Sequence, residues 1–308
     1  MKTKLHLLAI LPALVFSSSC SFMDLFNGGK KMKNVNVIIL SGQSNAVGCK
    51  ASKNLINSMG QEAYDKYLEG FENIKIAYNN YMVTDYNVKP HPMALQNSSK
   101  GKFVKVQLGQ GNVPENFGPE IGMAEELTEK WGDKLYIIKV ASGGSNLNDD
   151  WAQYTDEMFN NLVNFVSKKL GELEEEGLKP YIRAFCWMQG EGDAYPNYHQ
   201  YYKENLDSLK YNLDKSLLKF TEDDNLPFID AGIGPGPHKD GTNEWVYYKE
   251  VNEEKQRFAA QSETNIYFDT IEAGLHSNQE PSDDVHYDSE SQIKLGHLFA
   301  QNFEKFLK

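Results

Sequence analysis

Residues 35–46 read VNVIILSGQSNA, and this stretch decides the fold that the sequence predicts. From Val35 to Leu40, five of the six residues are valine, isoleucine or leucine, and no polar face alternates with them. Such a run is typical of a strand that is buried on both faces, as in parallel sheets. The turn residues that follow place Ser44 at the carboxyl end of this strand, the edge at which open α/β sheets bind ligands.

Ser44 has two interpretations in this position. A serine on a tight turn, backed by a histidine and a carboxylate, is the nucleophile arrangement of acyl-transfer hydrolases. Alternatively, Ser44 only caps the helix that follows the strand. The choice depends on what the rest of the chain brings to the same edge of the sheet.

The composition is that of a globular protein with an acidic surface. The chain has 308 residues, of which 40% are hydrophobic and 24% are charged, and its formal net charge is -12. This acidity argues against nucleic acid and against an anionic membrane face as partners. A neutral or uncharged substrate would not be repelled by it.

The first twenty residues resemble an export signal. Lys2 and Lys4 form a basic start, residues 7–16 are apolar but too few to span a bilayer, and small residues precede Cys20. A cysteine in this position is similar to a bacterial lipoprotein signal, although Ser17 stands where leucine is usual. We therefore expect an exported protein, either lipid-anchored through Cys20 at the cell surface or periplasm, or secreted.

Beyond the signal, the sequence divides into a tether over residues 21–33 and a single domain over residues 34–308. The domain contains two cysteines, Cys49 and Cys186. A disulfide between them is one alternative, and two buried free thiols are the expected state. The sequence contains no other run that is long enough to form a transmembrane helix.

Strands and helices alternate along the domain. Further strands are predicted at 73–78, 135–140, 182–188, 227–233 and 266–269, and helices at 55–69, from 118 onward, and at 155–176, 198–219, 244–262 and 289–307. This order predicts a three-layer α/β/α sandwich with a central, mainly parallel sheet. Residues 79–117 have little regular pattern, and we expect them to form either a wall of the substrate cleft or a solvated insertion.

Three of the predicted strands end in turns that carry hydrogen-bond donors. Ser44 follows one strand, Gly143 and Gly144 follow another, and Gln189 follows a third. Parallel strands bring these turns to one edge, where an ester hydrolase needs fixed donors for the oxyanion of its tetrahedral intermediate. The alternatives are a tight turn at the two glycines and a buried structural amide at Gln189.

The candidate general base is found among the histidines. Asp283 lies three residues before His286, between the last predicted strand and the closing helix. This spacing lets the carboxylate orient one imidazole nitrogen while the other faces the serine. His91 and His199 are predicted in polar loop or helix-surface settings, and His238 in a loop that is either near the cleft or solvated.

This combination resembles the SGNH (GDSL-like) hydrolase superfamily, and within it the branch of sialate O-acetylesterases and acetylxylan esterases. The segments that carry the resemblance are Gly42–Asn45, Phe117–Glu120, Gly143–Asn146 with Trp151, Trp187–Asp193, and Asp283 with His286. The resemblance covers roughly residues 35–305. It implies the fold predicted above and a carbohydrate O-acyl esterase that removes acetyl groups without a metal or an organic cofactor.

The resemblance also implies roles for individual residues. Ser44 is the nucleophile, His286 the base, and Asp283 the group that orients it. The oxyanion hole takes the amide of Ser44, an amide of Gly143 or Gly144, and the Gln189 side chain. The neighbouring Gln43, Asn45 and Glu191 are predicted to bind the acetylated carbohydrate.

Three rival hypotheses deserve comparison. The α/β-hydrolase fold requires Gly-x-Ser-x-Gly around a serine in mid-chain, whereas here Ala46 fills the last place and Ser44 follows the first strand. A catalytically inactive glycan-binding lipoprotein would be favoured by a decayed triad, yet all three members are present. A lipase or thioesterase of the same superfamily would need an apolar acyl channel, and residues 79–117 offer few consecutive hydrophobic residues.

Overall fold

The computed structural model describes residues 32–131, 135–222, 225–238, 240–277 and 285–307. The predicted signal, its Cys20 and most of the tether lie outside the described residues, as does Asp283. Within these ranges, no helix combines the length and the apolar character needed to cross a membrane.

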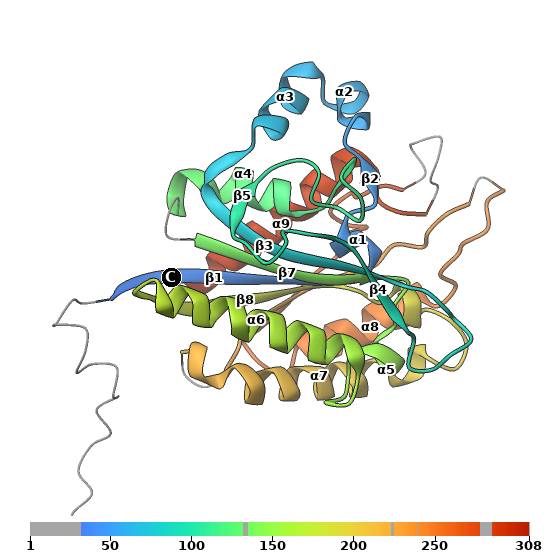
Figure 1. The fold of residues 1–308 in the computed structure, drawn as a ribbon. Coiled ribbons are helices and arrows are strands. Elements are labelled where there is room, and N and C mark those ends of the chain that lie inside the picture. Colours follow the sequence, from blue (N-terminus) through green and yellow to red (C-terminus); the bar gives the residue numbers. More distant parts are fainter. Residues whose placement is uncertain (1–31, 132–134, 223–224, 239, 278–284, 308) are drawn as a thin grey trace, which may run out of the picture. The chain divides into compact units, whose positions relative to one another are not determined.

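An eight-stranded sheet organises the described domain, in the order β10-β9-β8-β1-β7-β3-β4, with β5 also paired to β3 (Figure 1). The parallel strands are β1 (Lys33–Gly42), β3 (Phe71–Val83), β7 (Leu135–Gly143), β8 (Leu178–Met188), β9 (Phe228–Ala231) and β10 (Asn265–Phe268). Antiparallel to β3 run β4 (Met93–Ser98) and β5 (Val104–Val106), while β2 (Lys50–Ala51) and β6 (Asn116–Phe117) form a separate ribbon.

Helices cover both faces of this sheet (Figure 1). One face carries α2 (Asn54–Ser58), α3 (Gln61–Glu69), α4 (Glu120–Trp131) and α9 (Ser289–Glu304), and the other carries α6 (Glu157–Glu175), α7 (Tyr202–Leu217) and α8 (Tyr248–Ala259). Two short helices follow strand ends, α1 (Ser44–Val47) and α5 (Leu147–Asp150), and 3-10 turns lie at Glu191–Asp193, His199–Tyr201, Leu218–Phe220 and Lys305–Leu307. The predicted three-layer α/β/α sandwich with a mainly parallel sheet is confirmed.

Strand β1 lies at the centre of the sheet because its residues are apolar on both faces. It pairs with β8 on one side and β7 on the other, and Val37, Ile38, Ile39 and Leu40 are completely buried. Helices cover both faces of a strand that has parallel neighbours on both sides. This explains why the sequence of β1 does not alternate between apolar and polar residues.

Residues 79–117 are more regular than the sequence analysis expected. Strand β3 continues to Val83, and the segment contains β4, β5 and β6. These are short edge strands with polar residues, and their pairing with β3 or β2 is a tertiary interaction that local propensity does not reveal. Buried Asn80 shows the same dependence on tertiary contacts, since its amide donates to Gln110 O and Gly111 O at 2.9 and 2.7 Å.

The two cysteines of the described domain are not joined by a disulfide. Cys186 is completely buried in β8, as expected, whereas Cys49 is half-buried. Burial raises the pKa of the Cys186 thiol far above its ordinary value. Cys186 therefore acts as a small hydrophobic core residue.

Candidate active site

A cavity of about 710 Å³ lies at the carboxyl ends of β1, β7 and β8. Its walls include Ser44, Gly143, Gly144, Tyr195, Trp245 and His286. The three strands are parallel neighbours, and their following turns therefore meet at one edge, as the sequence predicted. This is the edge at which open α/β sheets bind ligands.

Ser44 is held in the cavity by a turn that only glycine can make. Gly42 has φ +138°, and a Cβ on this residue would lie 2.0 Å from Met188 O. The chain can therefore pass directly from β1 into α1 beside the end of β8. Gln43 N donates to Met188 O at 2.9 Å, and Ser44 becomes the first residue of α1, with its side chain in the cavity wall.

A buried ion pair supports α1 from beneath. Lys139 of β7 and Glu120 of α4 are both completely buried, and Lys139 Nζ lies 2.7 Å from Glu120 Oε2. The same ammonium donates to Val47 O, at the end of α1, at 2.7 Å. Glu120 Oε1 accepts from Gly118 N at 2.9 Å. The helix that begins with Ser44 is thus fixed to two other elements of the domain.

Gly143 and Gly144 form the second turn at the cavity. Gly144 has φ +75°, and a Cβ there would lie 2.1 Å from the Tyr86 hydroxyl, so a larger residue would be strained and crowded. Ser145 anchors the turn because its Oγ donates to Ser142 O and accepts from Trp151 Nε1, both at 2.8 Å. Both glycines line the cavity.

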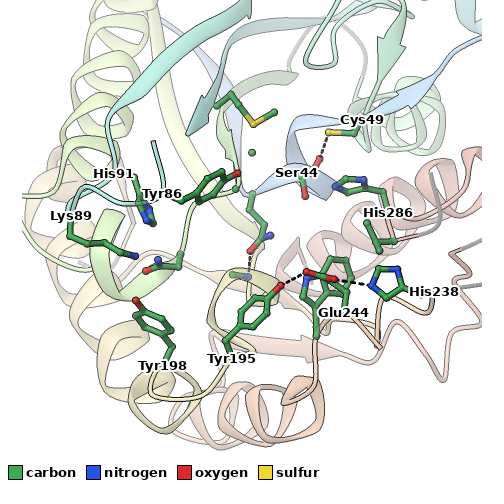
Figure 2. Close-up of a pocket in the computed structure, with 18 residues that line it drawn as sticks. Ser44, Cys49, Tyr86, Lys89, His91, Tyr195, Tyr198, His238, Glu244 and His286 are labelled. Atoms are coloured by element: carbon green, nitrogen blue, oxygen red, sulfur yellow. Dashed lines mark hydrogen bonds and ion pairs between the residues drawn. The ribbon is translucent and has the colours of Figure 1, made fainter. Parts of the chain in front are cut away.

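His286 reaches the same cavity from the segment that precedes α9. Figure 2 shows Ser44 and His286 on one side of the cavity, with Lys89 and His91 on the other. The fold thus brings together Ser44 and His286, which the sequence analysis paired as nucleophile and base. Their catalytic roles, and the orienting role of Asp283, stay predictions.

Comparison with known proteins shows to which family the chain belongs. The family described as "Carbohydrate esterase, sialic acid-specific acetylesterase" matches residues 34–305. The chain belongs to this family. The match confirms the predicted class of enzyme, a carboxylic-ester hydrolase that acts as a carbohydrate acetylesterase.

Solved structures share the fold of this esterase. A protein from Arabidopsis thaliana aligns with a TM-score of 0.56 at 20% identity, over 88% of this chain and 98% of its own. The protein NanS aligns with a TM-score of 0.55 at 12% identity, over 89% of this chain and 98% of its own. A search of curated proteins returned no match to the chain.

Gln189 lies completely buried beneath the cavity of the esterase and is not part of its wall. Its Nε2 donates to Asp193 Oδ2 at 2.6 Å and to Gln43 Oε1 at 3.1 Å, and its Oε1 accepts from the Tyr202 hydroxyl at 3.1 Å. A primary amide has two N–H donors, and both are used here. This geometry favours the structural alternative over the oxyanion role that the sequence analysis predicted for Gln189.

Asn45 and Glu191, both predicted to bind substrate, are buried and hydrogen-bonded to each other. Asn45 Nδ2 donates to Glu191 Oε1 at 2.8 Å, and Asn45 Oδ1 accepts from Tyr287 N at 3.2 Å. Gln292 Nε2 of α9 donates to Asn45 O at 2.6 Å. Neither Asn45 nor Glu191 belongs to the cavity wall, whereas Gln43 does. In this structure, the pair joins α1 to the residues around α9, and its contact with substrate stays a prediction.

His91 is a cavity residue that the sequence analysis did not single out. It lies in a loop, as predicted, but only 3% of it is exposed. Its Nδ1 lies 2.8 Å from Asp150 Oδ2, and its backbone N donates to Asp150 Oδ1 at 3.1 Å. Asp150 belongs to α5, after β7, so no local sequence signal could indicate this pairing.

His238, Tyr195 and Glu244 form a polar group on another part of the cavity wall (Figure 2). His238 Nε2 lies 2.8 Å from Glu244 Oε2, and the Tyr195 hydroxyl donates to Glu244 Oε1 at 2.5 Å. Of the two interpretations of His238, the structure therefore supports the one that places it near the cleft. Among the described residues, no group of three or more His, Cys, Asp and Glu side chains is placed to hold a metal ion.

Asp156 makes the stability of the fold depend on pH. It precedes α6, and its Oδ2 accepts from Gln153 N at 2.7 Å. Burial raises its pKa to about 6, and the nearby carboxylates of Asp150 and Asp149 add to this effect. The folded protein therefore holds a proton that the unfolded chain, with an ordinary carboxyl pKa, releases at lower pH. Stability falls as the pH rises from about 4 to about 6.

Asp156→Asn should remove this pH-dependent loss of stability, because asparagine keeps an acceptor for Gln153 N and does not ionise. The gain in the free energy of unfolding should be small near pH 4 and reach up to about 3 kcal/mol above pH 6, where Tm should rise by several degrees. Asp149→Asn is the control. Burial raises the pKa of Asp149, but hydrogen bonds from Lys89 and Asn146 outweigh this effect and lower it. The Asp149→Asn variant should therefore be no more stable than the wild type. Thermal unfolding across this pH range checks both, and a pH-independent gain for Asp156→Asn would contradict the explanation.

Proposed function

We propose that this esterase removes acetyl groups from an O-acetylated glycan or sialic acid by a serine mechanism. The observation that carries the proposal is the convergence of Ser44, His286 and the Gly143–Gly144 turn on one cavity. A hydroxyl, an imidazole and backbone N–H groups are the parts that acyl transfer through a serine requires. Family membership supports the carbohydrate ester as the substrate class.

In the proposed reaction, His286 accepts the Ser44 hydroxyl proton while Oγ attacks the ester carbonyl. The resulting oxyanion accepts hydrogen bonds from the backbone N–H of Ser44 and from that of Gly143 or Gly144. When the tetrahedral intermediate collapses, the sugar oxygen leaves with the proton held by His286. Water, activated by the same imidazole, then cleaves the acetyl-enzyme and releases acetate. We assign Asp283 to the orientation of His286 on sequence spacing alone.

The chemistry of the cavity wall supports a sugar rather than an acyl chain as the larger part of the substrate. Aromatic rings at Tyr86, Tyr195, Tyr198 and Trp245 line the cavity together with the polar side chains of His238 and Glu244. Rings stack on the apolar faces of sugars, and the polar groups hydrogen-bond to hydroxyls. A lipase or thioesterase would instead need a continuous apolar channel for the acyl chain.

We also propose that the enzyme works outside the cytoplasm. The proposal rests on the basic start, the short apolar run and the small residues before Cys20 in the sequence. Its two versions, a lipid anchor at Cys20 and plain secretion, are distinguished by labelling expressing cells with a fatty-acid probe and comparing wild type with Cys20→Ala.

Acetate release from a substrate panel tests the proposed function. The panel contains acetylated xylan, O-acetylated sialic acid, p-nitrophenyl acetate and p-nitrophenyl decanoate, and one acetylated carbohydrate is expected to give the highest kcat/KM. A preference for the decanoate would indicate a lipase or thioesterase instead. Binding of an acetylated glycan without acetate release would indicate the inactive glycan-binding protein.

A further inference from the structure

Gln43 is the residue immediately before Ser44 and occupies a special place at the cavity. Only 4% of it is exposed, yet it belongs to the cavity wall. Its backbone is fully engaged, because its N donates to Met188 O and its O accepts from the amides of Ala46 and Val47. The side-chain amide is therefore the part of Gln43 that can interact with a ligand.

The oxygen of this amide is held by three donors from the turn after β8. Oε1 accepts from Gly192 N at 2.9 Å, from Gly190 N at 3.3 Å and from Gln189 Nε2 at 3.1 Å. A backbone N–H can only donate, so the two glycine amides establish which end of the Gln43 amide is oxygen. The NH2 group must then lie on the opposite side, directed away from the β8 turn.

The NH2 group faces the cavity. Among the described residues, Gln43 Nε2 has no hydrogen-bond partner. It is nevertheless not one of the unpartnered polar atoms that are fully buried in the interior. The open space that Gln43 borders is the cavity shared with Ser44. Two N–H donors, held rigidly by the three bonds on the oxygen, are thus presented beside the candidate nucleophile.

We infer that Gln43 Nε2, and not Gln189, is the side-chain donor to the oxyanion of the tetrahedral intermediate. The inference rests on the proposed serine mechanism. Gln189 has both amide hydrogens engaged with Asp193 and Gln43, whereas Gln43 has two to offer. As the bond from Ser44 forms, the carbonyl oxygen gains negative charge and accepts from this NH2, which transfers no proton. A donor fixed before the reaction stabilises that charge without reorganisation.

Gln43→Glu tests the inference because it changes only the end of the amide that faces the cavity. One carboxylate oxygen retains the three donors of the β8 turn, and the other replaces the NH2 group. With p-nitrophenyl acetate, kcat should fall by roughly a hundredfold to a thousandfold, while KM and Tm change little. Inhibition by methylboronic acid, which forms a tetrahedral anion on a nucleophilic serine, should weaken by a similar factor.

Two further variants make the comparison decisive. Gln189→Met removes the buried amide, and it should lower Tm and cost less kcat than Gln43→Glu. Gln301→Glu places the same change on the exposed surface of α9 and should behave as wild type. The inference is wrong if Gln43→Glu keeps kcat within about fivefold of wild type, or if Gln189→Met loses a hundredfold or more at unchanged Tm.

Ser44→Ala separates this inference from the function on which it rests. An inactive Ser44→Ala together with a fully active Gln43→Glu leaves the serine mechanism intact and removes Gln43 from the oxyanion hole. An active Ser44→Ala overturns the serine mechanism and the role of Gln43 with it. Loss of kcat in both variants, with both proteins folded, supports the inference.

Discussion

Ser44→Ala should lower kcat for acetyl ester hydrolysis by at least about a thousandfold, the size of loss that follows removal of a triad nucleophile. The Ser44 hydroxyl makes no hydrogen bond within the described residues, so the fold should tolerate its removal. The variant should therefore retain the Tm of the wild type. Steady-state kinetics on acetylated substrate and thermal unfolding of the same preparation measure both quantities.

Cys49 provides the matched control for this experiment because its thiol is a second candidate nucleophile in the cavity wall. Its Sγ lies 3.5 Å from Ser44 O, close to the candidate nucleophile. Cys49→Ala should keep most of the activity. If Ser44→Ala stays active and Cys49→Ala is inactive, the nucleophile is Cys49 and not Ser44.

Lys139→Met should be the most destabilising of the single substitutions considered. It leaves the Glu120 carboxylate completely buried without its cation, and the loss of one partner of such a pair typically costs about 3–5 kcal/mol. Tm should fall by roughly 6–20 °C. Because Val47 O also loses its donor, α1 should loosen, and the remaining folded enzyme should be less active.

Two comparisons isolate the buried charge as the cause. Lys130 of α4 forms an exposed pair with Glu304, and Lys130→Met should leave Tm almost unchanged. Adding Glu120→Gln to Lys139→Met removes the uncompensated carboxylate and should restore part of the lost Tm. A Lys139→Met protein that is no less stable than Lys130→Met would contradict the role of the ion pair.

The elements that could be predicted from the sequence are those with a strong local pattern. Strand β1 reads as buried on both faces, and glycine or polar turns mark the ends of β1, β7 and β8. The rule that parallel strands share an edge is enough to gather these turns. Strands β4 and β5 were not predicted because their stability comes from pairing with β3, which their own residues do not signal.

The details of the site depend on contacts between distant parts of the chain. His91 in a loop pairs with Asp150 at the end of α5, and the Tyr195 hydroxyl donates to Glu244 across 49 residues of sequence. Gln43 lines the cavity and Gln189 lies beneath it, and the sequence does not indicate which of the two has its NH2 group hydrogen-bonded within the protein. Only the hydrogen bonds around Gln43 and Gln189 distinguish the two.

The bonds that join Asn45 to Tyr287 and Gln292 tie the first strand end to the last helix. Within the domain, the ribosome makes Ser44 before it makes the residues that complete its surroundings. Until the closing helix has been made, a nascent chain therefore carries the serine without a working site. Esterase activity should appear only when the closing helix docks, so it can serve as a reporter of the final step of folding.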